Sequence, residues 1–436
     1  MNTINRRLIS GGSWAFSGKV LTVFTALAVN ALLARLLTPE SLGAYFLTLS
    51  LVTISVSIAQ FGLNLAVVRF VAESLVKGQL SRAAKSVKIV FIFGAIGAVV
   101  VALILISGVG NWLAMEVFNS VLIKSVIGFA ALWIVVMTFQ NLSAETFRGF
   151  NDIRFATIFG GLLTGVLSAL LFTSLWMFNH DSNLIQVILL AITAGTINAL
   201  IALFLLRLRY NKIKGQDNSL TGKDVLVVAW PLWLSSLTIL VLAQVDLWIL
   251  GIFISQQDVA VYGAVVRMVI LISMPLLIVN AVIPPIITEM HATGNRKQLE
   301  KTLRKTTTIA AIPALIVVLL FIFFGSSILS FIYGDYYKLG STALMVLSFG
   351  KLVDVVAGSC GFALAMTGHQ KTIMLISIVC CLFVIGVSIL LVKPYGLVGV
   401  ASASAAGTIL WNFLALFAVK KKINIWTHMK LSITSL

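Results

Sequence analysis

Five ionisable side chains lie inside long apolar stretches of the sequence: the cations Lys19, Arg267 and Lys351, and the acids Asp246 and Asp354. Charges in such surroundings are costly, and they usually mark a functional site. A cation held away from bulk water attracts an anionic ligand several times more strongly than it would in solution. We therefore interpret the three cations as candidate contacts to an anionic ligand, and the two acids as candidate coupling residues.

Two of these charges are expected to pair. Asp246 and Arg267 each lie about ten residues from the turn near Gln256 and Gln257, so consecutive antiparallel helices would place them at similar depth. Lys351 and Asp354 are three residues apart and share one helix face. For both pairs the alternative is simple neutralisation of buried charge, because a buried ion without its partner is strongly destabilising.

The elements that carry these charges must be membrane-spanning helices. The chain has 436 residues, of which 60% are hydrophobic and only 10% are charged, against about 25% charged in soluble domains. Twelve apolar stretches are each long enough to cross roughly 30 Å of hydrocarbon, and continuous apolar runs in lipid must be helical. We expect an all-α polytopic membrane protein with helices near 13–37, 42–67, 89–112, 121–143, 155–178, 184–206, 225–254, 259–287, 309–332, 342–366, 372–392 and 397–419.

The net charge of +17, from 31 Lys and Arg against 14 Asp and Glu, follows the same topology. In a soluble protein it would suggest nucleic acid, but here the cations gather on alternate connections. The opposite connections hold at most Arg35, Lys124, Lys338 and Lys393. By the positive-inside rule both termini are cytoplasmic, and no nucleic-acid partner is expected.

The sequence has no stretch that we can interpret as a catalytic domain or a catalytic motif. The longest connections run to about twenty residues, which is far too short for a catalytic domain. The nearest approach to a phosphate-binding loop, Gly215 to Asp224, has the wrong spacing. The four His and three Cys share no ligand spacing. We expect a protein that is not an enzyme and holds no metal or other cofactor, with an ion or proton gradient as a possible energy source.

An internal repeat at an offset of about 217 residues organises the chain. Thr38–Tyr45 aligns with Ser255–Tyr262, Asn64 and Gly78 align with Asn280 and Gly294, and Arg148–Asp152 aligns with Thr367–Lys371. Each half has an even number of helices, so the halves are predicted to be parallel six-helix repeats, 1–215 and 216–436, around a central cavity. Five prolines between Pro231 and Pro313 predict kinks in the second half.

Several of these segments resemble one family. Leu32–Glu40 followed by Gly43-Ala44-Tyr45, then Phe61-Gly62-Leu63, Val68–Glu73 and the Arg148-Gly149 turn, are similar to the bacterial polysaccharide-export flippases. These O-antigen-type translocases belong to the multidrug, oligosaccharidyl-lipid and polysaccharide exporter superfamily. The resemblance implies two six-helix lobes that alternate access. It also implies a cargo of undecaprenyl-diphosphate-linked oligosaccharide, as in lipopolysaccharide assembly, with a glycan polymerase and glycosyltransferases as partners.

The resemblance gives the candidate residues possible roles. A ladder of Lys19, Lys351 and Arg267 at successive depths would suit a lipid diphosphate, although Lys19 can instead snorkel to the inner headgroups. Arg35 is expected at the interface or at the outer mouth. Gln60 and Asn64, four apart on one helix face, and the repeat mate Asn280, could bind sugar hydroxyls or form interhelical hydrogen bonds.

Two other functions stay open at this point. A multidrug cation antiporter of the related branch would carry several acids and few cations in its cavity, whereas this chain has three buried cations against two acids. A membrane scaffold for a glycan-assembly complex would need no charges within its spans.

Overall fold

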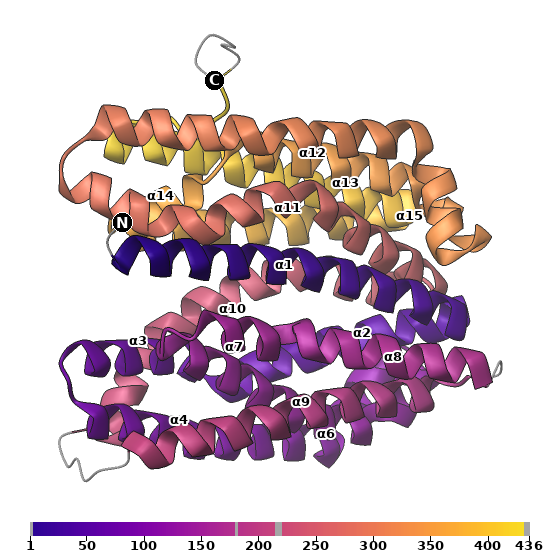
Figure 1. Ribbon diagram of the computed structural model, residues 1–436. Helices are drawn as coiled ribbons and strands as arrows, with labels where there is room; N and C mark the ends of the chain where they lie inside the picture. The colour runs from indigo at the N-terminus through magenta and orange to yellow at the C-terminus, as the bar shows by residue number, and fades with distance from the viewer. Residues whose placement is uncertain (1–2, 179–181, 214–219, 431–436) are drawn as a thin grey trace. The chain divides into compact units, whose positions relative to one another are not determined.

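The computed structural model describes residues 3–178, 182–213 and 220–430, and these residues form helices and connections without any strand (Figure 1). Eleven helical stretches among them are long and apolar enough to cross a membrane. The last, Gln370–Ile423, has 54 residues and would be about 80 Å long as one helix, more than twice the thickness of the hydrocarbon core. It is broken at Gly396, where φ is 53° and ψ is −133°. Its two parts complete the twelve predicted spans, and the all-α fold class is confirmed.

The chain forms two compact units, Met1–Leu240 and Val241–Leu436, here called unit 1 and unit 2. The division between them falls within one helix, α10 (Gly222–Phe253), about 25 residues after the division predicted at residue 215. In unit 1, α6 packs against α2, α3, α4 and α9, and α1 packs against α8. The elements that begin in unit 1 are α1 Thr3–Leu36, α2 Pro39–Gln60, α3 Leu63–Val76, α4 Leu80–Ile104, η1 Leu105–Val109, α5 Gly110–Trp112, η2 Leu113–Val117, α6 Val121–Gly149, α7 Ile153–Thr157, η3 Ile158–Leu162, α8 Leu163–Phe178, α9 Leu184–Ile213 and α10 Gly222–Phe253.

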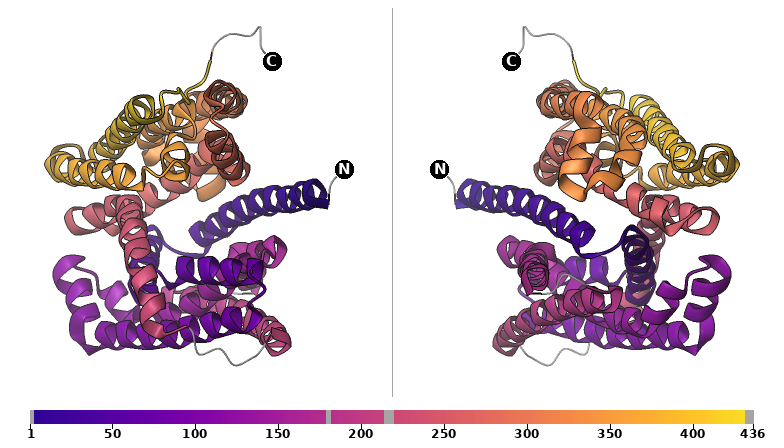
Figure 2. Two further views of the ribbon diagram at one scale, coloured as in Figure 1. Left: turned by 90° about the vertical axis from the view of Figure 1, so that its left-hand side faces the viewer. Right: turned by 90° about the vertical axis from the view of Figure 1, so that its right-hand side faces the viewer.

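Unit 2 is a second bundle, seen nearly end-on as the orange to yellow helices of Figure 2. Within it α13 packs against α11, α12 and α15. Its elements after α10 are α11 Gln256–Ala292, α12 Arg296–Tyr333, η4 Asp335–Gly340, α13 Ser341–Ala357, α14 Cys360–Met366 and α15 Gln370–Ile423.

The two units repeat the same local devices at the predicted offset. Thr38 caps α2 by accepting a hydrogen bond from the Ser41 N–H, and Ser255 caps α11 by accepting one from the Asp258 N–H. Gly78 and Gly294 both have left-handed backbones, with φ of 69° and 70°. The N–H groups that follow them donate back to Ser74 and Met290, at 2.8 Å and 3.1 Å. These matched caps are what a sequence repeat should produce.

The third predicted match, Arg148–Asp152 with Thr367–Lys371, joins the correct pair of turns, but the alignment is shifted by two residues. The left-handed residues of the two turns are Asn151 (φ 57°) and Gly368 (φ 83°), whereas Gly149 belongs to the end of α6. The following N–H groups close the same turn, with Asp152 donating to Phe147 and His369 to Leu364. Asn tolerates a left-handed backbone almost as Gly does, so aligning Gly149 with Gly368 was misleading.

Four of the predicted continuous helices are in fact broken. Two of the breaks lie at single glycines, Gly108 (φ 128°) in the stretch 89–112 and Gly161 (φ 140°) in the stretch 155–178. The stretch 42–67 is interrupted at Phe61 (φ 46°) and Gly62 (φ 77°), between α2 and α3. The stretch 342–366 is interrupted at Gly358 (φ 77°), between α13 and α14. Prolines do not make these breaks, since Pro231 and Pro313 lie inside continuous helices. The sequence predicts none of these glycine-bearing breaks.

Candidate functional site

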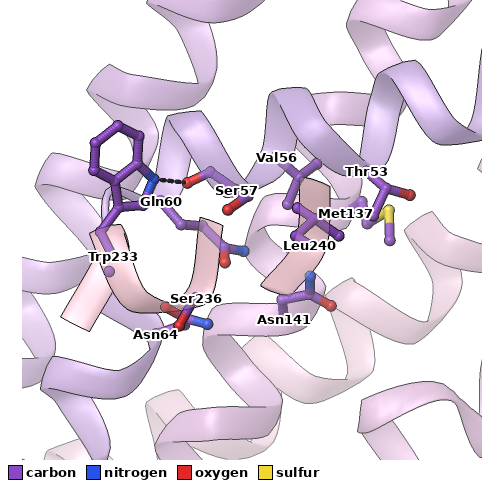
Figure 3. A pocket seen from close by; sticks show the side chains of 11 residues that line it. Thr53, Val56, Ser57, Gln60, Asn64, Met137, Asn141, Trp233, Ser236 and Leu240 are labelled. Carbon is purple, nitrogen blue, oxygen red and sulfur yellow. Dashed lines mark hydrogen bonds between the residues drawn. The ribbon is translucent and has the colours of Figure 1, made fainter. Parts of the chain in front are cut away.

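A cavity of about 240 Å³ lies inside unit 1 at the break between α2 and α3 (Figure 3). Pockets that hold drug-sized ligands measure roughly 300–1,000 Å³, so this cavity admits one part of a larger ligand. The residues that line it come from α2, α3, α6 and the first half of α10: Thr53, Val56, Ser57, Gln60, Gly62, Asn64, Met137, Asn141, Trp233, Ser236 and Leu240.

The helix break shapes the cavity because α10 docks directly onto it. A methyl group added at Gly62 would overlap the carbonyl oxygen of Ala229, and it would lie 2.9 Å from the backbone N of Trp233. The Trp233 ring stacks on Phe61 with the centroids 4.9 Å apart, and its Nε1–H donates to the Ser57 carbonyl at 2.8 Å. Only glycine permits this backbone approach with φ at 77°, so the corner between α2 and α10 is fixed.

The lining combines apolar side chains with polar ones and carries no charge. Three side-chain amides, those of Gln60, Asn64 and Asn141, face the same space as the hydroxyls of Thr53, Ser57 and Ser236 (Figure 3). Amides and hydroxyls both donate and accept hydrogen bonds. The cavity can therefore bind an uncharged ligand that has several hydroxyl or amide groups.

Two of the amides in the cavity are available to a ligand. The side chains of Asn64 and Asn141 have no hydrogen-bond partner within the part of the chain that the structure describes, and both are partly accessible. Gln60 is 3% exposed and its Nε2–H donates to the Thr138 carbonyl at 3.4 Å. Polar groups in the interior of a membrane protein are expected to find partners, here a ligand or water.

The structure brings together two of the four unit 1 residues predicted as site residues. Gln60 and Asn64 lie on either side of the break, and both line the cavity. Lys19 and Arg35 lie on α1, where both are exposed, and α1 contributes none of the lining residues. The predicted roles of Lys19 and Arg35 stay predictions.

In unit 2, Asp246 is the centre of a buried polar group. It is 8% exposed, and its Oδ2 accepts a hydrogen bond from the Tyr262 hydroxyl at 2.8 Å. Ser404 lies beside the carboxylate, and Lys351 is near enough to act on it electrostatically. Arg267 donates from Nη1 to the Gly263 carbonyl of its own helix at 2.8 Å. Neither hydrogen bond joins Asp246 to Arg267, so the expected pair stays a prediction.

The other predicted residues of unit 2 gather near the break at Gly358. Asp354 accepts a hydrogen bond from Asn412 Nδ2 at 3.0 Å, and Asn280 accepts one from the Ser359 hydroxyl at 2.6 Å. Lys351 and Asp354 lie on one helix, α13. Lys351 acts electrostatically on Asp246, whereas Asp354 accepts the hydrogen bond from Asn412. The structure therefore sorts the predicted residues into separate neighbourhoods.

Sequence reasoning missed several residues of the site. Asn141, Trp233 and Ser236 line the cavity, and Tyr262 holds Asp246. Asn141 could have been found, because an amide in the middle of an apolar stretch is itself a signal. Trp233 and Ser236 could not, since nothing in their local sequence reveals that α10 docks at a break in α2. Among the described residues no group of three His, Cys, Asp or Glu side chains could hold a metal ion.

Comparison with known proteins identifies the family to which the sequence is similar. The family model described as "Polysaccharide biosynthesis protein" matches residues 8–291, and a second model, described as MatE, matches residues 231–390. The capsular polysaccharide biosynthesis protein CapF of Staphylococcus aureus is 23% identical over 237 residues, which are 54% of this chain and 60% of CapF. The chain thus spans less than two thirds of that relative.

A second relative and a solved structure extend the likeness. The probable low-salt glycan biosynthesis flippase Agl15 of Haloferax volcanii is 25% identical over 379 residues, which are 85% of this chain and 75% of Agl15. The inward-facing structure of a MATE family multidrug transporter of the MOP superfamily superposes with a TM-score of 0.80 at 16% identity, covering 95% of this chain and 98% of that one. At that identity the superposition establishes the fold and nothing finer.

Proposed function

Since the chain belongs to the polysaccharide biosynthesis protein family, we propose that it is a flippase for an undecaprenyl-diphosphate-linked oligosaccharide. In this proposal it carries the glycan from the cytoplasmic to the outer leaflet by alternating access. The glycan then enters a cell-surface polysaccharide such as O-antigen lipopolysaccharide. Glycosyltransferases that build the repeat unit and a polymerase that joins it are the proposed partners.

The observation that carries this choice is the lining of the unit 1 cavity. It offers amide and hydroxyl groups and no carboxylate. A multidrug antiporter needs an acid in its cavity to hold a lipophilic cation, because a cation buried without a counter-charge is strongly disfavoured. The same lining suits a glycan, so the flippase is favoured over the antiporter, which shares this fold.

The charged end of such a cargo is proposed to meet the cations of unit 2. Arg267 and Lys351 are both half-buried, and a phosphate in a poorly hydrated site gains strongly from a nearby guanidinium or ammonium group. Lys19 is the proposed inner contact, on the cytoplasmic half of α1, and Arg35 the outer one. Asp246, close to Lys351, is the proposed coupling group: a proton or ion bound there would change the charge that Lys351 faces.

Reconstituted vesicles would test the proposal. A fluorescent polyprenyl-diphosphate trisaccharide is incorporated into both leaflets, and the fraction that an external glycosidase can cleave is followed. We expect cleavage of nearly all of the lipid with the intact chain and about half with Arg267→Ala/Lys351→Ala. The control Lys421→Ala, at an exposed residue in the last turn of α15, should again give cleavage of nearly all of it. Full cleavage with the double variant, or export of a dye cation with no movement of the glycan lipid, would refute it.

We propose the cytoplasmic membrane as the location, with both termini in the cytoplasm. Single cysteines placed at Thr221 and Lys422 should then react with a membrane-impermeant maleimide only after the cells are opened. The native Cys360, Cys380 and Cys381 are buried and give little background. Ready labelling of either site in intact cells would reverse the orientation.

A further inference from the structure

The cavity of unit 1 differs from a site for the charged part of a lipid-linked glycan. None of its lining residues is Lys, Arg, Asp or Glu. A phosphate or a carboxylate placed there would lose its hydration without gaining a counter-charge, which is strongly unfavourable. A ligand with several hydroxyls and no net charge loses far less, because each hydroxyl finds an amide or a hydroxyl in the wall.

The wall offers hydrogen bonds from three directions. Asn141 projects from α6, Asn64 from the first turn of α3, and Ser236 from α10, while Gln60 closes the end of α2 (Figure 3). An amide can donate to one sugar hydroxyl and accept from its neighbour at the same time. Polar groups placed on several sides of a sugar ring discriminate between sugars, because a missing or inverted hydroxyl leaves an amide of the wall without its partner.

The cavity is also held in shape before any ligand arrives. The stacked pair of Phe61 and Trp233, with the bond from Trp233 to Ser57, fixes one side. Behind it, Ala229 and Val225 of α10 are fully buried in a core cluster with Leu63 and Val67 of α3. A preformed site spends little of its binding energy on ordering, which favours selective recognition.

From these observations we propose that the cavity between α2, α3, α6 and α10 binds an uncharged pyranose ring of the cargo and reads the identity of that sugar. The inference rests on the proposed flippase function, and it names the part of the cargo that unit 1 recognises. It assigns Asn64 and Asn141 as residues that determine sugar specificity. The diphosphate binds elsewhere.

Equilibrium binding to the full chain in nanodiscs tests this inference. The probes are a bare polyprenyl diphosphate, the same lipid bearing a single glucose, galactose or N-acetylglucosamine, and the same lipid bearing glucuronate. With the intact chain at least one neutral sugar should tighten binding about tenfold over the bare lipid, from two hydrogen bonds worth about threefold each. Glucuronate should give no gain, because its carboxylate has no cation to meet.

Two variants then locate the effect. Asn64→Leu/Asn141→Leu should reduce the gain from the neutral sugar to less than about twofold and leave the affinity for the bare lipid unchanged. Asn211→Leu, which removes an exposed amide on α9 of the same unit, is the matched control and should keep the full gain. Leucine has the same number and branching of side-chain heavy atoms as asparagine, so both variants are expected to fold. Thermal unfolding verifies this.

Each outcome decides the matter. Binding of the bare lipid with no gain from any neutral sugar, a gain from glucuronate, or an undiminished gain in the Asn64→Leu/Asn141→Leu variant would overturn the inference alone. If the folded chain bound none of the lipids, the proposed flippase function would fall, and this inference with it.

Discussion

Both units contain a helix that breaks at a glycine with φ of 77°, Gly62 in unit 1 and Gly358 in unit 2. The breaks are not repeat mates. The counterpart of α2–α3 is α11, which runs unbroken from Gln256 to Ala292, and the counterpart of α13–α14 is α6, unbroken from Val121 to Gly149. The break therefore falls in a different helix of the repeat in each unit.

What fills each break also differs. In unit 1 the break is covered by Trp233 and Ala229 of α10, and a cavity with a neutral polar lining stays beside it. In unit 2 it is covered by the segment after α15. Thr427 donates from Oγ1 to the Ala357 carbonyl at 2.9 Å, and the Met429 N–H donates to the Val356 carbonyl at 2.9 Å. The break in unit 1 therefore borders a candidate ligand site, whereas two carbonyls at the break in unit 2 accept hydrogen bonds from the segment after α15.

The largest expected effect comes from adding a methyl group at either break. Gly62→Ala combines a left-handed backbone with overlap against the Ala229 carbonyl, and Gly358→Ala does the same against the Thr307 hydroxyl. Each should lower the free energy of unfolding by about 2–4 kcal/mol. Thermal unfolding in detergent, followed by size-exclusion chromatography, measures this loss.

Gly78→Ala is the matched control for both. Its φ is 69°, but nothing lies within 4 Å of the added methyl group, so only the backbone cost of about 1 kcal/mol is expected. If Gly62→Ala and Gly358→Ala melted at the same temperature as Gly78→Ala, the close packing described around Gly62 and Gly358 would be contradicted.

A smaller effect tests the closure of the unit 2 break. Thr427→Val removes the donor to the Ala357 carbonyl from a fully buried position, and an unsatisfied buried carbonyl costs about 1–3 kcal/mol. Thr238→Val is the control, because Thr238 is only partly buried in the first half of α10 and its hydroxyl donates to the Leu234 carbonyl of its own helix. Equal thermal stability of the two variants would show that the terminal segment does not hold the break.

The devices that depend on local sequence could be predicted. The sequence pairs Thr38 with Ser255 and Gly78 with Gly294 at the repeat offset, and the structure has a helix cap at both members of the first pair and a left-handed turn at both members of the second. The break at Phe61 could not, because phenylalanine has no preference for a φ of 46°, and its ring packs against Trp230 and Trp233, which lie far away in the sequence. Tertiary contacts override local preference at such positions.

The partners of the buried charges were equally beyond the sequence. Depth along two helices can be estimated from residue counts, and these counts predict a similar depth for Asp246 and Arg267. Whether two side chains meet depends on how each helix is rotated, which residue counts do not fix. In the structure Asp246 accepts a hydrogen bond from Tyr262. In the sequence Tyr262 is only the last residue of the repeat match Ser255–Tyr262, which gives no reason to pair it with Asp246.

The smallest effect concerns a surface pair that unit 2 lacks. Lys77 donates to Glu73 at 2.6 Å and holds the pKa of Glu73 below its usual range, whereas the residue four positions after Glu289 is Thr293. A lowered pKa stabilises the fold at pH values above the ordinary pKa of Glu, and this contribution disappears as the pH falls through the folded pKa.

Lys77→Gln should therefore return the pKa of Glu73 toward its usual range, with almost no change in melting temperature at pH 7, because the pair is exposed. The melting curves of the variant and the parent should converge in acid. A loss at pH 7 as large as that of Thr427→Val would mean that this pair is more than a surface contact.

One measurement separates the roles of the two units most directly: the flipping rate of two lipids, a bare polyprenyl diphosphate and its neutral glycosylated form, in vesicles. The account predicts that Arg267→Ala/Lys351→Ala slows both lipids by a similar factor. Asn64→Leu/Asn141→Leu should slow only the glycosylated lipid and leave the bare diphosphate at the rate of the intact chain. If both double variants slowed both lipids equally, the assignment of sugar to unit 1 and diphosphate to unit 2 would be contradicted.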